Sequence, residues 1–437
     1  MLKPVYSAYR QYIETIFLEA LKAVDPYRLI SSSIQSAEGK LFLGGTAFNF
    51  GSHTNSYLIG IGKAAGGMTH AFLDISKLQP RAGVIAIPPT DPTTFPYPFT
   101  VFHAGHPHPT QASIDAGFAA SVVLEECHPE DVVWVLISGG GSALFELPVP
   151  GIELGDLHQV NELLLHSGLS IKEVNIIRGT LSQVKAGGLA RMANPARVIS
   201  LIISDVIGDA LGSIASGPTV LIPDQRLEAR QLLMDNDLWS RLPERVRAVL
   251  NQTRSPRGRA RRPTNILLGG NRQLIGGAAG AAQSLGFNVK VLSRQMQGEA
   301  RQVGRKFARR LVKLSRGIEH PTCFIMGGET TVTVQGAGKG GRNQELALSS
   351  AAILQGHGRI ALASLASDGI DGPTDAAGGV IDGKTHARIT SMGFDPDLAL
   401  DQNASYAALQ SGNALFHTGP TGTNVADLTL GLIFPKE

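Results

Sequence analysis

Short, continuously apolar runs alternate with amphipathic segments over the first half of the chain. Apolar runs of strand length, bounded by glycine or proline, are typical of strands buried on both faces of a sheet. They predict strands at 56–62, 82–88, 99–106, 131–137 and 196–203. Helices are predicted at 5–24, after residue 63, at 110–127 and within 153–194. This alternation predicts an α/β fold with a mainly parallel sheet covered on both faces.

The same alternation resumes in the second half, after a segment of different composition. Residues 251–263 contain five arginines and two prolines without apolar periodicity, which indicates a solvated linker. Beyond it, strands are predicted at 265–270, 287–293, 322–328, 330–336, 359–366 and 427–434, with helices between most of them. The predicted division is therefore a domain at 1–250, a linker at 251–263 and a smaller α/β domain at 264–437.

Composition and charge narrow the range of partners. Hydrophobic residues make up 43% and charged residues 17% of the chain, which fits a globular protein. The net charge of +3 is too small to indicate nucleic acid as the main partner. No apolar run approaches the ~20 residues of a membrane-spanning helix. The N-terminal segment lacks a signal-peptide core, and the two cysteines have no metal or redox spacing, so we expect a cytoplasmic protein without membrane association.

A run of three glycines follows the predicted strand at 131–137. The candidate phosphate- or substrate-binding residues of this loop are Ser138, Gly139, Gly140, Gly141 and Ser142. Glycine lets a backbone approach an anion closely, and the serine hydroxyls can donate hydrogen bonds. The alternative is a tight turn between strand and helix. Because three glycines exceed what a turn requires, we favour binding of a phosphate or a carboxylate.

Two cations stand at the expected starts of helices. Lys63 follows the first buried strand, and Arg342 opens the helix after the glycine-rich segment 336–341. A cation there opposes the helix dipole, so a ligand anion would explain both positions. Asn343 and Glu345, in the first turn after Arg342, are further candidate phosphate- or substrate-binding residues.

Aspartates recur where predicted strands end. Asp205 and Asp209 follow the strand at 196–203, and Asp368 follows the strand at 359–366. Mg²⁺ is usually held by one or two such carboxylates together with phosphate oxygens. These three aspartates are therefore candidate metal ligands, the alternative being turn and cap positions beside glycine and proline.

The segment GGVIDGKT at 378–385 satisfies the phosphate-loop pattern G-x-x-x-x-G-K-[ST]. The strand expected to feed it ends about ten residues earlier, and Asp382 inside the match would repel phosphate. We interpret the match as accidental.

Several ordered motifs resemble one family. They are GIGKAAGGM, HPHPT, LISGGGSALFELPVPGI, IIRGTLSQVKAGGLAR, SDVIGDALGSIASGPT, GGETTVTVQGAGKGGRNQELAL, SDGIDGPTDAAGGVID and HTGPTGTNVADL. Together they resemble the type II glycerate kinases, the D-glycerate 2-kinase family with a C-terminal MOFRL domain, over nearly the whole chain. The resemblance implies a Rossmann-like N-terminal domain, a smaller C-terminal domain and an active site in the cleft between them. It also implies transfer of the ATP γ-phosphoryl group to the 2-hydroxyl of D-glycerate, with Mg²⁺ or another divalent cation, and roles for Lys63 and Arg342.

Two other readings stay open from the sequence. The first is an NAD(P)H-dependent hydroxypyruvate reductase, favoured by G-x-G-x-x-x-G at 60–66 but lacking an acidic residue directly at the end of the second strand. The second is a non-catalytic module that senses a sugar acid or a nucleotide. The sequence allows a homo-oligomer without indicating one.

Overall fold

The computed structural model describes residues 4–37, 40–44, 46–49, 54–252 and 260–436. The chain forms two compact units: a central unit, Pro26–Leu268, and a terminal unit of Met1–Asp25 with Gly269–Glu437. This division differs from the expected boundaries at 250 and 264, because the first helix packs with the C-terminal half and the strand after the arginine-rich segment joins the central sheet. Residues 253–259 of the expected linker lie outside the described residues.

The central unit is built on a six-stranded sheet. In spatial order its strands are β6 (Phe99–His103), β5 (Ala82–Ile87), β4 (Ser56–Ile61), β7 (Val132–Ile137), β8 (Arg197–Ile203) and β9 (Thr264–Gly269). The pairs from β6 to β8 are all parallel and in unbroken register. Strands β4 and β7 are buried at every position, as their continuous apolar sequences predict. The mainly parallel sheet predicted for this half is confirmed.

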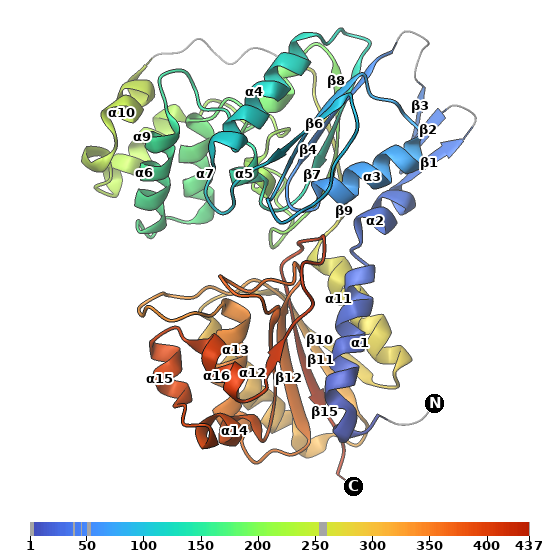
Figure 1. Cartoon of the computed structure of the whole chain (residues 1–437), viewed down its shortest axis with the longest axis vertical. Coiled ribbons are helices and arrows are strands. Elements are labelled where there is room, and N and C mark those ends of the chain that lie inside the picture. Colours follow the sequence, from blue (N-terminus) through green and yellow to red (C-terminus); the bar gives the residue numbers. More distant parts are fainter. Residues whose placement is uncertain (1–3, 38–39, 45, 50–53, 253–259, 437) are drawn as a thin grey trace. The chain divides into compact units, whose positions relative to one another are not determined.

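Helices cover both faces of this sheet (Figure 1). On one face Phe72 of α3 (Ala65–Ser76) packs on Trp134, with ring centroids 4.8 Å apart. On the other, α4 (Gln111–Glu125) joins the core formed by Tyr57 and Ile59. The short helices α5 and α8 follow β7 and precede β8. Their bounds are Gly141–Leu144 for α5 and Gly188–Met192 for α8.

Four further helices of the central unit share a core of their own. They are α6 (Leu154–Leu165), α7 (Ile171–Thr180), α9 (Arg226–Asp235) and α10 (Glu244–Asn251). The unit begins with α2 and a three-stranded antiparallel sheet that the sequence patterns did not predict. Their bounds are Pro26–Ser33 for α2, and Ile34–Ala37, Lys40–Leu43 and Thr46–Asn49 for β1, β2 and β3.

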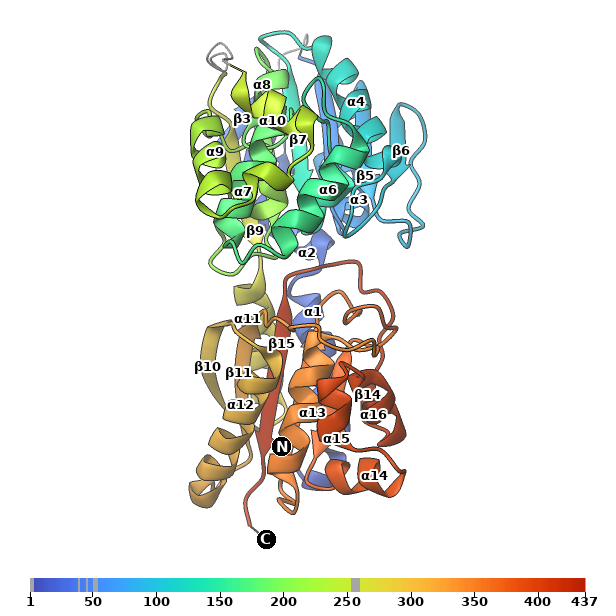
Figure 2. The same cartoon turned by 90° about the vertical axis from the view of Figure 1, so that its left-hand side faces the viewer.

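The sheet of the terminal unit is mixed. Its spatial order is β10 (Asn288–Met296), β11 (Thr322–Gly328), β15 (Asp427–Ile433), β12 (Ile360–Ala366), β13 (Gly378–Asp382) and β14 (Leu415–Phe416). Only β10 and β11 are parallel; the last strand of the chain, β15, runs antiparallel between β11 and β12. Figure 2 shows β15 beside β11. Helices α1 (Tyr9–Lys22) and α11 (Asn271–Ser284) pack together closely, since a Cβ on Gly277 would lie 2.6 Å from that of Ala23. This contact explains why the N-terminal helix belongs to this unit.

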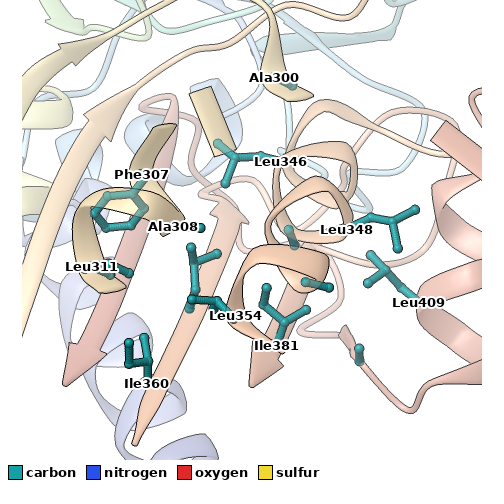
Figure 3. Close-up of a cluster of buried hydrophobic side chains, with 14 of the residues drawn as sticks. Ala300, Phe307, Ala308, Leu311, Leu346, Leu348, Leu354, Ile360, Ile381 and Leu409 are labelled. Carbon is teal, nitrogen blue, oxygen red and sulfur yellow. The ribbon is translucent and has the colours of Figure 1, made fainter. Parts of the chain in front are cut away.

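The core of the terminal unit lies between its sheet and α12 (Ala300–Leu314) with α13 (Arg342–Leu354) (Figure 3). Three short helices complete it: α14 (Thr385–Ser391), α15 (Pro396–Asp401) and α16 (Ser405–Ser411). The strand predicted at 330–336 is wrong, because only Thr331 forms an isolated bridge, to Glu299. No helix within the described ranges combines the length and apolar character needed to cross a membrane.

Candidate active site

The loop after β4, at 62–64, and the loop after β7, at 138–142, meet where the strand order of the central sheet reverses. Strand β4 lies between β5 and β7, so the chain leaves the ends of β4 and β7 toward opposite sides, which is where open α/β sheets bind ligands. The amide of Lys63 donates to the carbonyl of Gly139 at 2.9 Å, and the amide of Ala64 donates to Ser138 Oγ at 2.9 Å. Lys63 and the 138–142 loop, predicted separately, therefore lie against each other.

Each glycine of this loop faces a different neighbour. A Cβ on Gly139 would lie 2.2 Å from an oxygen of Asp205, and one on Gly141 would lie 2.7 Å from the Cβ of Ala215. Gly140 has a φ of 82°, and a Cβ there would approach the side chains of Lys63 and His106 at 3.1 Å. Close packing thus requires glycine at 139 and 141, while Gly140 needs its left-handed backbone.

The loop also presents hydrogen-bond donors that the protein itself does not use. The amides of the four residues from Gly139 to Ser142 donate to no acceptor within the described part of the chain. Consecutive amides of this kind form a concave site for an anion. The Ser138 hydroxyl accepts from Ala64, and the Ser142 hydroxyl lies 2.8 Å from Ser216 Oγ, so the serines fasten the loop to its neighbours.

The structure places two further residues, Ser216 and His106, beside the 138–142 loop, and the sequence patterns did not select either of them for this site. Ser216 is buried, has a φ of 60° and donates to Asn175 at 3.2 Å. The preceding Ala215 also has a positive φ, of 50°. Two consecutive non-glycine residues in this conformation are strained, and such strain clusters at functional sites. The sequence signal was slight: Ser216 lies in a quoted motif, SIASGPT, and His106 in HPHPT.

The three aspartates predicted as metal ligands lie in different places. Asp205 is half-buried beside Gly139. Asp209 lies in the following turn with a φ of 54°. Asp368 belongs to the terminal unit, where its carboxylate accepts from the amide of Ile370 at 3.1 Å, as the turn alternative predicted. Among the described residues, no three carboxylate, imidazole or thiol groups gather as a metal site. Asp205 alone lies on the 138–142 loop.

Arg342 opens α13 as predicted, but its charge is already paired. Its Nε donates to Asp427 Oδ2 at 2.6 Å and its Nη2 to Oδ1 at 3.0 Å, while Nη1 lies 2.9 Å from Glu329. Burial alone would lower the pKa of the guanidinium, but the Asp427 and Glu329 carboxylates raise it above its ordinary value. One cation with two carboxylates is net negative, so two carboxylates of the protein itself, rather than a ligand anion, already account for the charge of Arg342. Lys63 and Arg342 belong to different units.

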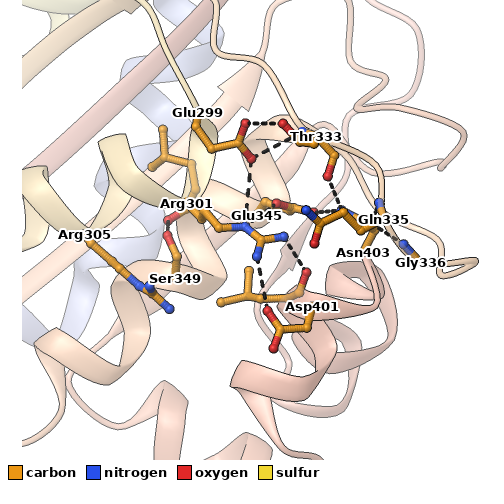
Figure 4. A network of polar contacts seen from close by, with 12 residues as sticks. Glu299, Arg301, Arg305, Thr333, Gln335, Gly336, Glu345, Ser349, Asp401 and Asn403 are labelled. Atoms are coloured by element: carbon orange, nitrogen blue, oxygen red, sulfur yellow. Dashed lines mark hydrogen bonds and ion pairs between the residues drawn. The ribbon is translucent and has the colours of Figure 1, made fainter. Parts of the chain in front are cut away.

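Asn343 and Glu345 point into the terminal unit. Asn343 is fully buried and bonds Asp371 and Ser364. Burial raises the pKa of Asp371 to about 6, with the nearby Asp427 charge contributing. Glu345, also buried, accepts from Asn403, whose own oxygen accepts the amides of Gln335 and Gly336 (Figure 4). Glu345 thus supports the start of segment 336–341 through Asn403, whereas Asn343 ties the start of α13 to Asp371 and β12.

The glycines of segment 336–341 pack so closely against neighbouring residues that a side chain would not fit. A Cβ on Gly336 or Gly338 would lie 2.4 Å from the carbonyl oxygen of Gln402, and one on Gly340 would lie 2.1 Å from Ser405 Oγ. A Cβ on Gly341 would lie 2.4 Å from the Asp371 carboxyl. The glycine content of 336–341 is therefore explained by contacts inside the unit.

The phosphate-loop match at 378–385 begins as a strand. Residues Gly378–Asp382 form β13, paired antiparallel with β12, so they cannot surround a phosphate. Asp382 accepts from the amide of Lys384 and from Thr385 Oγ1 at the start of α14. The interpretation of the match as accidental agrees with this geometry.

The sheet order and the loops at its reversal define a Rossmann-like α/β protein, and comparison with known proteins refines this class. Residues 12–251 match a family described as a domain of unknown function (DUF4147), and residues 322–427 match the MOFRL family. Glycerate 2-kinase of Pyrococcus horikoshii is 38% identical over 96% of both chains. D-glycerate 2-kinase of Thermotoga maritima is 40% identical over 86% of this chain and 90% of that one. The chain belongs to the glycerate kinase family.

A solved structure supports the same assignment. The crystal structure of a glycerate kinase from Thermotoga maritima matches with a TM-score of 0.83 and 35% identity, covering 98% of this chain and 100% of that one. One further relative, from Agrobacterium vitis, carries a hydroxypyruvate reductase name; it is 37% identical over 86% of this chain and 98% of its own.

Proposed function

We propose that this chain transfers the γ-phosphoryl group of ATP to the 2-hydroxyl of D-glycerate, giving 2-phosphoglycerate and ADP. The observation that carries the proposal is the group of four unused amides at 139–142 beside Lys63, at the reversal point of the sheet. Phosphoryl transfer needs little covalent chemistry from the protein and depends on positioning and on stabilisation of charge. Family membership supplies glycerate and ATP as the substrates that fit.

Each part of the site has a distinct task in this proposal. The amides of 139–142 hold phosphoryl oxygens, and Lys63 stabilises the charge that develops on them during transfer. Asp205 fits the requirement for a Mg²⁺ ligand, because its carboxylate lies against the same loop and one or two carboxylates with phosphate oxygens suffice. The cation, when bound, would neutralise phosphate charge there.

We further propose that Arg342 takes part in phosphoryl transfer by binding a phosphate oxygen. Asp427 holds the guanidinium by two hydrogen bonds, which leaves the contact with the partly exposed Glu329 as the one to exchange for that oxygen. Asn343 and Glu345 then act by positioning, since they order the helix start and the segment before Arg342.

The hydroxypyruvate reductase is the second candidate, favoured by the sheet order and by the name of one relative. A dinucleotide fingerprint also needs an acidic residue at the end of the second strand to hold the ribose. Strand β5 ends at Ile87 and is followed by two prolines and a threonine, with no acidic residue before Asp91. This departure weighs against a dinucleotide.

A pair of assays separates the two activities. The purified chain with Mg-ATP and D-glycerate is expected to release ADP and 2-phosphoglycerate, identified by its conversion with enolase rather than as the 3-isomer. The same preparation with NADH and hydroxypyruvate is expected to leave the absorbance of NADH unchanged. NADH oxidation without ADP release would reverse the assignment, and the absence of both reactions would favour a sensing module.

Both cysteines are buried free thiols, which suits the cytoplasmic location that we propose.

A further inference from the structure

A cavity of the central unit opens beside the 138–142 loop and has no role in the proposal so far. Its volume is about 40 Å³, and it is bordered by Ser142, by helices α6 and α7 and by Pro107 with Pro109. A buried water needs a cavity of roughly 10–15 Å³, so this cavity has room for about three waters. It suits a small polar group and is far too small for a nucleotide.

Three charged side chains line the cavity, and two of them neutralise each other. Glu146 and Lys185 are both buried and form an ion pair. Glu146 also accepts from Ser182 Oγ and from the amide of Leu147, so its oxygens are well satisfied. The third charge, Arg178, leaves the cavity with one net positive charge. A single negative charge is the matching ligand.

The Arg178 side chain is half-buried, and only its Nε has a hydrogen-bond acceptor among the described residues. Its Nε donates to Asn161 Oδ1 at 2.8 Å, which fixes the guanidinium plane. Its two Nη groups donate to no acceptor in the part of the chain that the structure describes. Burial lowers the pKa of the guanidinium and the Glu146 charge opposes this, but arginine stays charged at neutral pH in either case. A fixed guanidinium with free donors is suited to a carboxylate, which it can bind through two parallel hydrogen bonds.

We propose that this cavity binds the carboxylate of the substrate, with Arg178 as its partner, and that it selects small 2-hydroxy monocarboxylates. The proposal rests on the function proposed above, because it assigns the acceptor end of the same site. The 2-hydroxyl is attached to the carbon next to the carboxylate. A carboxylate held beside Ser142 therefore keeps that oxygen close to the 139–142 amides that would hold the phosphoryl group. A larger acid would exceed the volume of the cavity, and a doubly charged acid would exceed its single net positive charge.

The test is Arg178→Gln, which removes the charge but keeps a polar side chain. We expect the KM for D-glycerate to rise about 100-fold, within the range for a lost hydrogen bond to a charged group, and the KM for ATP to stay within about threefold. The uncharged glyceramide gives a second readout. The wild type should prefer glycerate to glyceramide strongly, and Arg178→Gln should lose most of that preference. Arg178→Lys, which keeps the charge without the fork, should lie between them.

Arg245→Gln is the matched control, since Arg245 is an exposed arginine of the same unit that pairs with Glu153 at the surface. It should leave both KM values unchanged. If folded Arg178→Gln keeps the wild-type KM for glycerate and the same preference over glyceramide, the cavity assignment is wrong while the kinase proposal stands. Where Arg178→Gln disrupts folding, the same result in folded Arg178→Lys decides. If the wild type does not phosphorylate glycerate, the kinase proposal fails separately. Calorimetric titration of D-glycerate then decides the cavity: binding lost in the variant supports it, and equal or absent binding overturns it.

Discussion

The two glycine-rich loops of this protein look alike in sequence and differ in the cation beside each. The loop at 138–142 packs against Asp205 and Ala215, and the segment at 336–341 packs against residues 402–405 and Asp371. Glycine permits close approach in both places. Consecutive amides without an acceptor in the described chain also occur in both, at 139–142 and at 339–342. The backbone donors alone therefore do not distinguish the two loops, and the comparison turns on Lys63 and Arg342.

The contacts of these two cations differ. Arg342 is held by the buried Asp427 and contacts Glu329. Lys63 donates its backbone amide to the carbonyl of Gly139, and we propose that its side chain acts on a phosphoryl group. Mutation should therefore separate an effect on stability at Arg342 from an effect on turnover at Lys63.

The largest effect expected is on stability, from Arg342→Ala. Asp427 is fully buried, and loss of its partner would leave an uncompensated charge. Such losses typically cost about 3–5 kcal/mol, and we expect about 3 kcal/mol here because Arg342 itself is partly exposed. Denaturant unfolding measures the change. The double variant Arg342→Ala/Asp427→Asn removes the buried charge and should recover most of the stability. If it also recovered activity, the catalytic role proposed for Arg342 would be excluded.

Lys63→Ala should show the opposite pattern. We expect turnover to fall at least about 100-fold, near 3 kcal/mol of lost electrostatic stabilisation, with little change in melting temperature. Lys172→Ala, at an exposed position on α7, is the control and should keep full turnover. A folded Lys63→Ala protein with near-normal turnover would remove Lys63 from the site, and the contrast between the two cations would disappear.

A pair of glycine substitutions sharpens the comparison of the loops themselves. In Gly338→Ala the new Cβ would meet backbone atoms of Gln402 and Ala404 at 2.4–2.7 Å, so stability should fall by about 1–3 kcal/mol. In Gly139→Ala the Cβ would meet Asp205, whose carboxyl can rotate away but whose Cβ, at 2.9 Å, can move only with a small shift of the backbone. Turnover should then fall about tenfold while the free energy of unfolding falls by about 1 kcal/mol, less than in Gly338→Ala. Equal stability losses would show that both loops are structural.

The sequence predicted the parallel sheet because β4, β7 and β8 are continuously apolar, and it located the 138–142 loop because that loop follows β7 directly. It could not show that Arg342 faces Asp427, since the two residues are 85 positions apart and meet only through the antiparallel pairing of β15. For the same reason α1 was assigned to the wrong unit: its partner, α11, follows it by some 250 residues. Local patterns predict elements and strand ends, whereas side-chain partners depend on contacts distant in sequence.

The smallest effect concerns a third glycine-rich segment with its own cation, Lys384. This residue precedes α14, and its amide donates to Asp382 Oδ1 at 3.0 Å, a bond that alanine preserves. Its side chain is exposed, and Gly378 and Gly379 lie in β13. Lys384→Ala should therefore leave the KM for ATP within about threefold of wild type, equivalent to roughly 0.7 kcal/mol, and the melting temperature unchanged. The steady-state assay that detects the Lys63 effect measures this one as well. A hundredfold loss in folded Lys384→Ala would mean that β13 opens to admit a nucleotide, and the interpretation of 378–385 as an accidental match would be wrong.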